Sequence, residues 1–157
     1  MKKNLRADRY FSRVRNIQRQ IEQKEELAQG LREQAEKMTA RLSPVSVQSS
    51  ADKRVMADNI EQMSDLLTEI ELEKAQLLYL LMEVRGVINA IDDPDHRFIL
   101  EMVYLNNKSL REIGQILHYC TATVKNKYHT ALNDAVIPEA FGEDAQPGST
   151  VQGDRRK

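Results

Sequence analysis

The chain has little of what a large globular core or a β-sheet needs. Its 157 residues include no Trp, three Phe, five Tyr, six Gly and four Pro, while 30% of them are charged. Few stretches combine turn residues with alternating β-branched residues, so strands have little support. The scarcity of aromatic side chains and the high charge instead favour elongated helices with narrow apolar seams. The sequence therefore predicts an all-α fold.

Long apolar runs and paired cysteines are also missing. The longest purely apolar run is Leu77 to Met82, far shorter than the roughly 20 residues that cross a bilayer. No apolar segment of a secretory signal follows the basic N-terminus. The single cysteine, Cys120, cannot form an internal disulfide, which agrees with a reducing compartment. We expect a soluble, cytoplasmic protein with no membrane partner.

The net charge of −1 conceals a polarised distribution. Residues 1–24 hold eight Lys/Arg against two acids, whereas residues 25–91 hold seven against twelve. The basic arm has two interpretations, which the sequence leaves open. It is either a solvated helix face or an auxiliary contact for nucleic acid.

Two heptad patterns predict a helical hairpin over residues 1–91. Apolar residues recur at alternating steps of three and four from Ala7 to Leu42 and again from Met56 to Ile91, and each pattern is broken once, by Lys24 and by Lys74. Ser43-Pro44 ends the first helix, and Ser49 or Ser50 is a plausible N-cap for the second. Folding back at this loop pairs residue 42 with 56 and 21 with 77, so the two lysines face one another. They should repel unless their side chains reach toward Glu25, Glu71 or Glu73. We expect an antiparallel coiled coil with arms of about 38 residues, roughly 57 Å long.

The hairpin also raises the question of self-association, because two helices bury only one stripe each and are thin for independent stability. The apolar residues either serve packing within the hairpin alone, or those outside the seams form a second face for self-association. The residues that suggest such a face, and with it a homodimer through the hairpin, are Phe11, Leu27, Leu66 and Leu80.

Residues 92–137 predict a small three-helix domain after the acidic, Pro-containing segment Asp92–Asp95. Within it, Ser109 and Glu112 form a capping-box pattern at the start of the second helix, and His118–Cys120 breaks the pattern before a third helix from Thr121. Two short helices joined by a three-residue turn are typical of a helix-turn-helix. The polar, Gly- and Pro-containing residues 138–157 cannot bury enough apolar surface, so we expect a disordered tail.

The third helix, Thr121 to Asn133, is the expected DNA reader. At about 100° per residue its apolar side chains share one face, and those residues are Val124, Tyr128, Ala131 and Leu132. The opposite face and its flanks carry short or polar residues that suit base edges and phosphates. With Arg111 on the preceding helix, the candidate DNA-binding residues are Thr121, Ala122, Thr123, Lys125, Asn126, Lys127, His129 and Thr130. Asn126 suits a bidentate bond to adenine, whereas Lys125 and Lys127 suit the phosphate walls.

The segment Ser109–Leu132, S-L-R-E-I-G-Q-I-L-H-Y-C-T-A-T-V-K-N-K-Y-H-T-A-L, resembles region 4 of sigma factors and related response-regulator output domains. A long helical region in front of such a domain is similar to phage-encoded transcriptional regulators of the RinA and ArpU type. The resemblance covers roughly residues 97–133. It implies a regulator of late or packaging genes in a prophage, with RNA polymerase as a further partner. The sequence departs from the family pattern at Gly114, where Ala is usual, and at His118 and Cys120 in the turn.

Enzymatic and cofactor chemistry has no sequence support. The chain lacks G-x-x-x-x-G-K-[ST], G-x-G-x-x-G and G-x-S-x-G, and its three His and one Cys lack metal-ligand spacing. We therefore expect a sequence-specific DNA-binding regulator that is not an enzyme and has no cofactor or metal. Two alternatives stay open: a phage DNA-packaging protein like a small terminase subunit, and a coiled-coil adaptor whose terminal bundle binds RNA polymerase or another protein.

Overall fold

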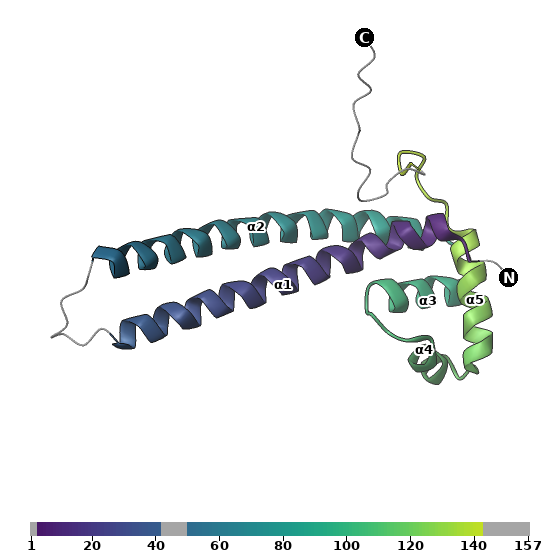
Figure 1. The fold of residues 1–157 in the computed structure, drawn as a ribbon. Coiled ribbons are helices and arrows are strands. Elements are labelled where there is room, and N and C mark those ends of the chain that lie inside the picture. The colour runs from purple at the N-terminus through teal and green to yellow at the C-terminus, as the bar shows by residue number, and fades with distance from the viewer. Residues whose placement is uncertain (1–2, 42–49, 143–157) are drawn as a thin grey trace, which may run out of the picture.

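The computed structural model describes residues 3–41 and 50–142, and in these ranges the chain is helical with no strand. The helices are α1 (Leu5–Arg41), α2 (Ser50–Asn89), α3 (Pro94–Tyr104), α4 (Leu110–Leu117) and α5 (Thr121–Asp134). Figure 1 shows α1 and α2 side by side as a long hairpin, with the three short helices gathered at the end where α1 begins and α2 ends. The predicted all-α fold, a hairpin followed by a small helical unit, is confirmed.

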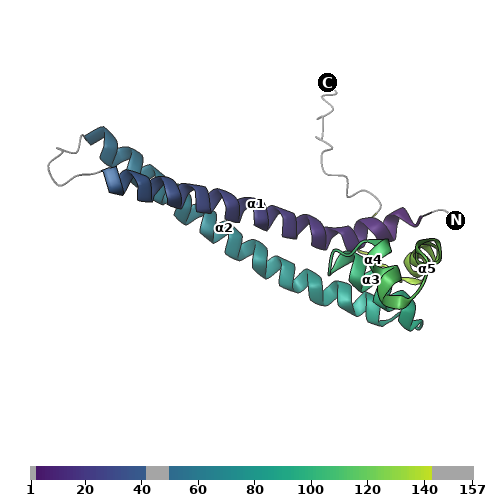
Figure 2. The same cartoon turned by 90° about the horizontal axis from the view of Figure 1, so that it is seen from below.

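The predicted seam of α1 is confirmed along its described length. From Ala7 to Met38, each of its positions is buried or half-buried. Leu42 and the predicted connecting loop, including Ser49, lie outside the described residues. The two arms cross at a shallow angle in Figure 2, as expected for helices that share a narrow apolar stripe.

The predicted seam of α2 is wrong at alternate levels. Ile60 and Leu67 are 52% and 42% exposed, and Lys74 is also exposed. The positions one residue earlier face α1 instead, and these half-buried residues are Asn59, Leu66 and Glu73. Steps of three and four are both compatible with a helix of 3.6 residues per turn, and neither track of α2 is uniformly apolar, since one carries Glu73 and the other Lys74. The partner helix therefore decides which track is buried.

This shift corrects the predicted contact between Lys24 and Lys74. The Lys24 ammonium lies 2.5 Å from the Glu73 carboxylate and 3.1 Å from Glu69, whereas the Lys74 ammonium lies 2.9 Å from Glu25 across the hairpin. Glu73 and Glu25 lie one residue to either side of the levels expected for the two lysines, so the predicted register of the two arms holds. The lysines do not repel one another, because each is paired with carboxylates of the other arm.

The apolar residues predicted to form a self-association face are mostly internal, which is a second correction. Phe11 and Leu80 are buried and Leu66 is half-buried, so only Leu27, at 57% exposure, is on the surface. The Phe11 ring lies 5.2 Å from that of Tyr104 in α3. Phe11 is off the α1 seam because it packs against the short helices instead of α2.

One buried cluster joins the base of the hairpin to the three short helices. Its members come from all five helices; α1 supplies Ala7, Tyr10, Phe11 and Val14. The predicted boundary at residue 92 falls in the short connection from α2 to α3. There Asp93 caps α3 by accepting hydrogen bonds from the backbone N–H groups of Asp95 and His96. The N-terminal part of α1 thus packs against the core formed by the three short helices.

A polar network also connects the start of α1 with α3 and α5. The Tyr104 hydroxyl donates to Asp8 at 2.5 Å and lies 2.7 Å from the Tyr128 hydroxyl, and Lys3 lies 3.0 Å from Asp8. Burial, followed by the hydrogen bond to Asp8, raises the pKa of Tyr104. These residues belong to α3, α5 and the start of α1, so the network fixes α5 against the hairpin.

The expected disordered tail is wrong for its first residues. Phe141 is half-buried with its ring 5.3 Å from Tyr10, and the Arg13 guanidinium lies 4.9 Å from the same ring. Arg6 donates hydrogen bonds to the carbonyls of Pro138 and Phe141. An isolated aromatic residue in a polar stretch is enough to hold residues 138–142 on α1. Residues 143–157 lie outside the described chain.

Candidate nucleic-acid interface

The first helix of the predicted helix-turn-helix, α4, begins at the predicted capping box. The Ser109 hydroxyl accepts from the Glu112 backbone N–H at 3.2 Å, and the Glu112 carboxylate accepts from the Ser109 backbone N–H at 2.8 Å. These hydrogen bonds satisfy donors that a helix start otherwise leaves unpaired. The backbone N–H and the hydroxyl of Ser109 lower the pKa of Glu112. The start of α4 is therefore fixed by local sequence.

The turn between α4 and α5 explains why residue 114 is glycine. His118 ends α4 in the left-handed conformation with φ 58°, and the Tyr119 N–H donates to the Gly114 carbonyl at 2.9 Å. A Cβ on Gly114 would lie 2.7 Å from the Tyr119 carbonyl oxygen, a backbone atom. The tight return of the chain over α4 thus accounts for this departure from the resembled family.

Helix α5 is anchored by the predicted inward face. Val124, Tyr128, Ala131 and Leu132 are all buried. They pack in the common core, and Asn4 donates to the Leu132 carbonyl from the start of α1. Four anchors over nine residues fix the rotation of α5 about its own axis. The identity of the residues that it exposes is settled by this packing.

The predicted outward face of α5 divides into exposed and half-buried residues. Thr121, Ala122, Lys125 and Asn126 are exposed. The other four predicted residues of α5 are half-buried: Thr123, Lys127, His129 and Thr130. Exposure is therefore concentrated in the first two turns of the helix, next to the turn from α4.

His129 differs most from a solvent-facing base reader. Its ring lies 5.4 Å from that of Tyr128, and its Nδ1 is buried without a hydrogen-bond partner in the described chain. Burial, followed by the charge of Lys125, lowers its pKa. The imidazole is neutral at pH 7 and lacks the charge that would attract phosphate.

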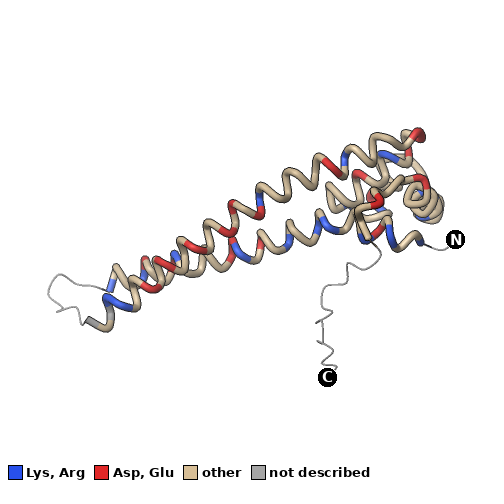
Figure 3. The backbone as a smooth tube through the Cα atoms, turned by 90° about the horizontal axis from the view of Figure 1, so that it is seen from above, with Lys and Arg blue, Asp and Glu red and all other residues tan. Residues whose placement is uncertain are grey.

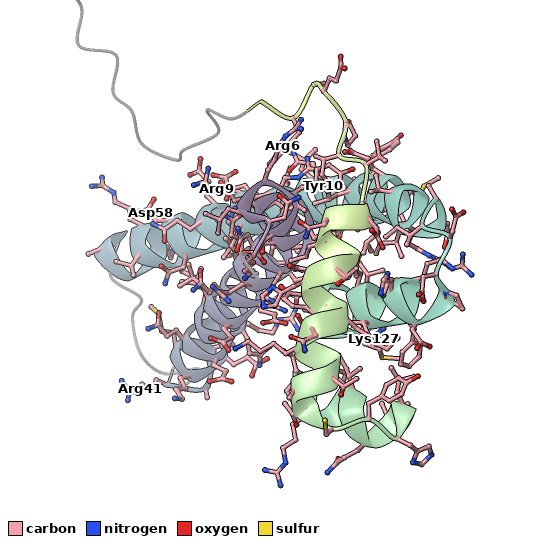
Figure 4. All side chains as sticks on the ribbon, turned by 90° about the vertical axis from the view of Figure 1, so that its right-hand side faces the viewer. Arg6, Arg9, Tyr10, Arg41, Asp58 and Lys127 are labelled. Carbon is pink, nitrogen blue, oxygen red and sulfur yellow. The ribbon has the colours of Figure 1, made fainter. Side chains whose placement is uncertain are left out.

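The two predicted phosphate-contacting lysines are not equivalent. Lys127 lies 3.1 Å from Asp95 and 5.3 Å from the ring centroid of Tyr119, and the hydrogen bond to Asp95 raises its pKa. Figure 4 shows Lys127 on the side of α5 that faces α3. Lys125 is exposed, as is Arg111 on α4. Among the described residues predicted to contact DNA, Lys125 and Arg111 are therefore the exposed cationic ones.

Most described basic side chains of the N-terminal arm are paired with other groups of the protein. Arg13 pairs with Glu83 at 3.0 Å, and Arg15 donates to the Val103 carbonyl at 2.7 Å and to Asn107. Figure 3 shows Lys and Arg spread along α1, with Asp and Glu on the same helix. Arg19 is exposed and, with Lys108, lines a cleft of about 460 Å³ between α1 and the turn before α4. The sequence did not single out Arg19, although the basic run of residues 1–24 contains it.

Metal-binding clusters and membrane-spanning helices are both absent from the described part of the chain. Within residues 3–41 and 50–142, no three His, Cys, Asp or Glu side chains come together as a metal-binding group. None of the helices in these ranges has the length and hydropathy required to cross a bilayer.

Comparison with known proteins identifies a family without a described activity. The chain belongs to the family described as "Protein of unknown function (DUF1492)", whose profile matches residues 37–137. The matched range runs from the end of α1 through α2 and the three short helices, and it stops just after α5. No curated protein and no solved structure matches the chain.

Proposed function

We propose that this protein is a sequence-specific regulator of transcription that places α5 in the major groove of double-stranded DNA. The observation that carries the proposal is the surface of α5. A helix held by four buried side chains exposes Thr121, Ala122 and Asn126 in its first two turns, beside the turn from α4. In helix-turn-helix proteins the N-terminal part of the second helix contacts base edges.

Each exposed group has a role that its chemistry allows. The Asn126 amide can bond the N6 and N7 atoms of adenine, and the Ala122 methyl can contact the methyl of thymine. Lys125 and Arg111 supply phosphate contacts that orient the helix without reading sequence. Lys127 has no such role, because Asp95 already neutralises it.

The resemblance adds a narrower proposal: the protein is a regulator of the phage type that acts on late or packaging genes with RNA polymerase. Its support is the order of the parts: a long helical hairpin in front of a small unit with a capped α4, a three-residue turn and α5. Transcription from a template that carries the selected site, with and without the protein, tests this part.

The test of DNA binding begins with selection of bound sites from random duplex DNA. Affinity for the selected site and for random DNA is then measured by fluorescence anisotropy over a range of salt. Asn126→Ala should cost about 1–3 kcal/mol on the selected site and little on random DNA. Lys125→Ala should weaken both and reduce the slope of log affinity against log salt by about 0.9.

Lys127→Ala is the matched control, since it removes the same charge from the other flank of α5, two residues further along the chain. It should leave the salt slope nearly unchanged, because its ammonium is committed to Asp95. Equal slopes for both lysine variants, or selected-site binding that Asn126→Ala leaves intact, would remove α5 from the reading role.

A further inference from the structure

Helix α2 has a second apolar face, opposite the one that packs on α1. Its large members are Leu72, Leu78, Tyr79 and Met82, which are 62%, 61%, 77% and 66% exposed. Ala75 and Gly86 lie among them and are also exposed. At about 100° per residue these six positions share one arc of the helix, and the buried residues Val84 and Ile88 lie on the far side.

Nothing in the described chain covers this face. Figure 1 shows α2 along one edge of the molecule, with α3, α4 and α5 on the other side of the hairpin. Four large apolar side chains in contact with water are costly, and contiguous exposed patches of this kind mark interaction sites. Leu78 lies at the edge of this arc, between the charged residues Glu71 and Arg85, and the other five positions form the stripe.

We infer that the stripe pairs with the same stripe of a second copy of this chain, with the two α2 helices antiparallel and a two-fold axis passing at Tyr79. The stripe is self-complementary about that residue. In an antiparallel pair centred there, the two Tyr79 side chains meet at the axis, Leu72 of one copy lies at the level of Gly86 of the other, and Ala75 lies within one residue of the level of Met82. Large residues thus face small ones on both sides of the axis, which lets the helices interlock.

Gly86 is the residue that fits this arrangement best. A Cβ added to it would have no atom within 4 Å, so the space beside it is open. Glycine inside a long helix costs stability relative to alanine, and the packing of one copy gives no reason for it. A cavity for Leu72 of the second copy supplies the reason. A parallel pair would instead place Gly86 opposite Gly86 and leave the cavity empty.

Charges beside the stripe agree with the antiparallel arrangement. Glu71 and Arg85 are exposed, and neither forms an ion pair with another described residue. Both lie on the same flank of the stripe by helical geometry. A two-fold axis at Tyr79 brings the same flanks together and sets Glu71 of each copy near Arg85 of the other. A parallel pair would bring opposite flanks together and leave Glu71 and Arg85 apart.

The size of the face predicts a reversible dimer. A large side chain offers roughly 150–250 Å², so four that are 61–77% exposed provide on the order of 500 Å² per copy. The total of about 1,000 Å² is near the lower limit of specific interfaces. The dimer should therefore dissociate on dilution. The proposed dimer does not depend on DNA binding, because its interface contains no residue of α5.

Sedimentation equilibrium of the full chain without DNA, over a wide range of concentration, measures the association. Gly86→Leu should weaken it roughly tenfold or more, since each substitution is met twice across a two-fold axis. The same variant should keep or raise the melting temperature, because nothing in one copy obstructs the new side chain. Leu27→Glu, on the exposed side of α1, is the matched control and should change neither quantity.

The geometry has its own test. Arg85→Glu and Glu71→Arg should each weaken the dimer, and the double variant should recover it. In a Cys120→Ser background, Leu72→Cys mixed with Gly86→Cys should form disulfides between unlike chains. A chain that stays monomeric at all concentrations, rings larger than a dimer, association unaffected by Gly86→Leu, or disulfides mainly between like variants would each overturn the inference.

Discussion

Substituting alanine for glycine should have opposite effects at two helical positions of this protein. Gly30 lies on the exposed surface of α1, and a Cβ there would have no atom within 4 Å. Gly114 lies in α4, and a Cβ there would lie 2.7 Å from the Tyr119 carbonyl oxygen and 3.5 Å from Val124 Cγ2. The same chemical change therefore meets open solvent in one helix and backbone in the other.

The magnitudes follow from three effects. Alanine in place of glycine favours a helix by about 1 kcal/mol, and at Gly30 this is the only effect. At Gly114 the added methyl overpacks the turn, which costs about 1–3 kcal/mol. If the turn opens to relieve the contact, the hydrogen bond from the Tyr119 N–H to the Gly114 carbonyl is lost as well, at about 0.5–1.5 kcal/mol. The three effects together should make Gly114→Ala destabilising by about 0.5–3.5 kcal/mol.

Thermal unfolding followed by circular dichroism measures both variants. In a chain of this size, 1 kcal/mol corresponds to a shift of about 2–4 °C. Gly30→Ala should raise the midpoint and Gly114→Ala should lower it. A rise at both positions would show that the chain after α4 does not return as closely as the structure has it, and the account of the turn would fail.

Three further outcomes are expected from thermal unfolding. Lys24→Met should lower the midpoint, because it leaves the half-buried Glu73 carboxylate without its partner, whereas Lys24→Met with Glu73→Leu should recover or exceed the original midpoint; a rise from the single substitution would mean that the pair is not formed. Ser109→Ala should cost about 0.5–2 kcal/mol by removing the cap of α4, and an unchanged midpoint would show that the capping box contributes nothing. Tyr104→Phe should cost about 0.5–1.5 kcal/mol, since Asp8 loses its closest hydroxyl donor, and the loss should be smaller when Asp8→Ala is already present, because only the bond to Tyr128 is then removed; equal losses in both backgrounds would contradict the network.

Features that depend on neighbouring residues in the chain could be predicted from the sequence. The capping box at Ser109 and Glu112 and the apolar face from Val124 to Leu132 are both confirmed. Each needs only helical geometry and side chains three or four residues apart. The candidate reading face follows from the same geometry, so Asn126 and Lys125 could be placed on the surface without a structure.

Features that depend on a distant partner could not be predicted in this way. Lys127 has the same local sequence context as Lys125, and only the approach of α3 pairs it with Asp95. Phe141 sits in a polar stretch, and Tyr10 and Arg13 hold it from the other end of the chain. In both cases the deciding contact joins residues that are far apart in sequence.

The two arms of the hairpin show where this division lies. In α1 one track of the three-and-four pattern is apolar, so the sequence by itself determined the buried face. In α2 two tracks compete, because Leu66 and Leu80 lie on one, Leu67 and Leu81 lie on the other, and a charged residue interrupts each. Helical periodicity cannot distinguish tracks one residue apart. Packing against α1 decided that Glu73 faces Lys24 and that Lys74 lies outside, and it left the second apolar stripe of α2 exposed.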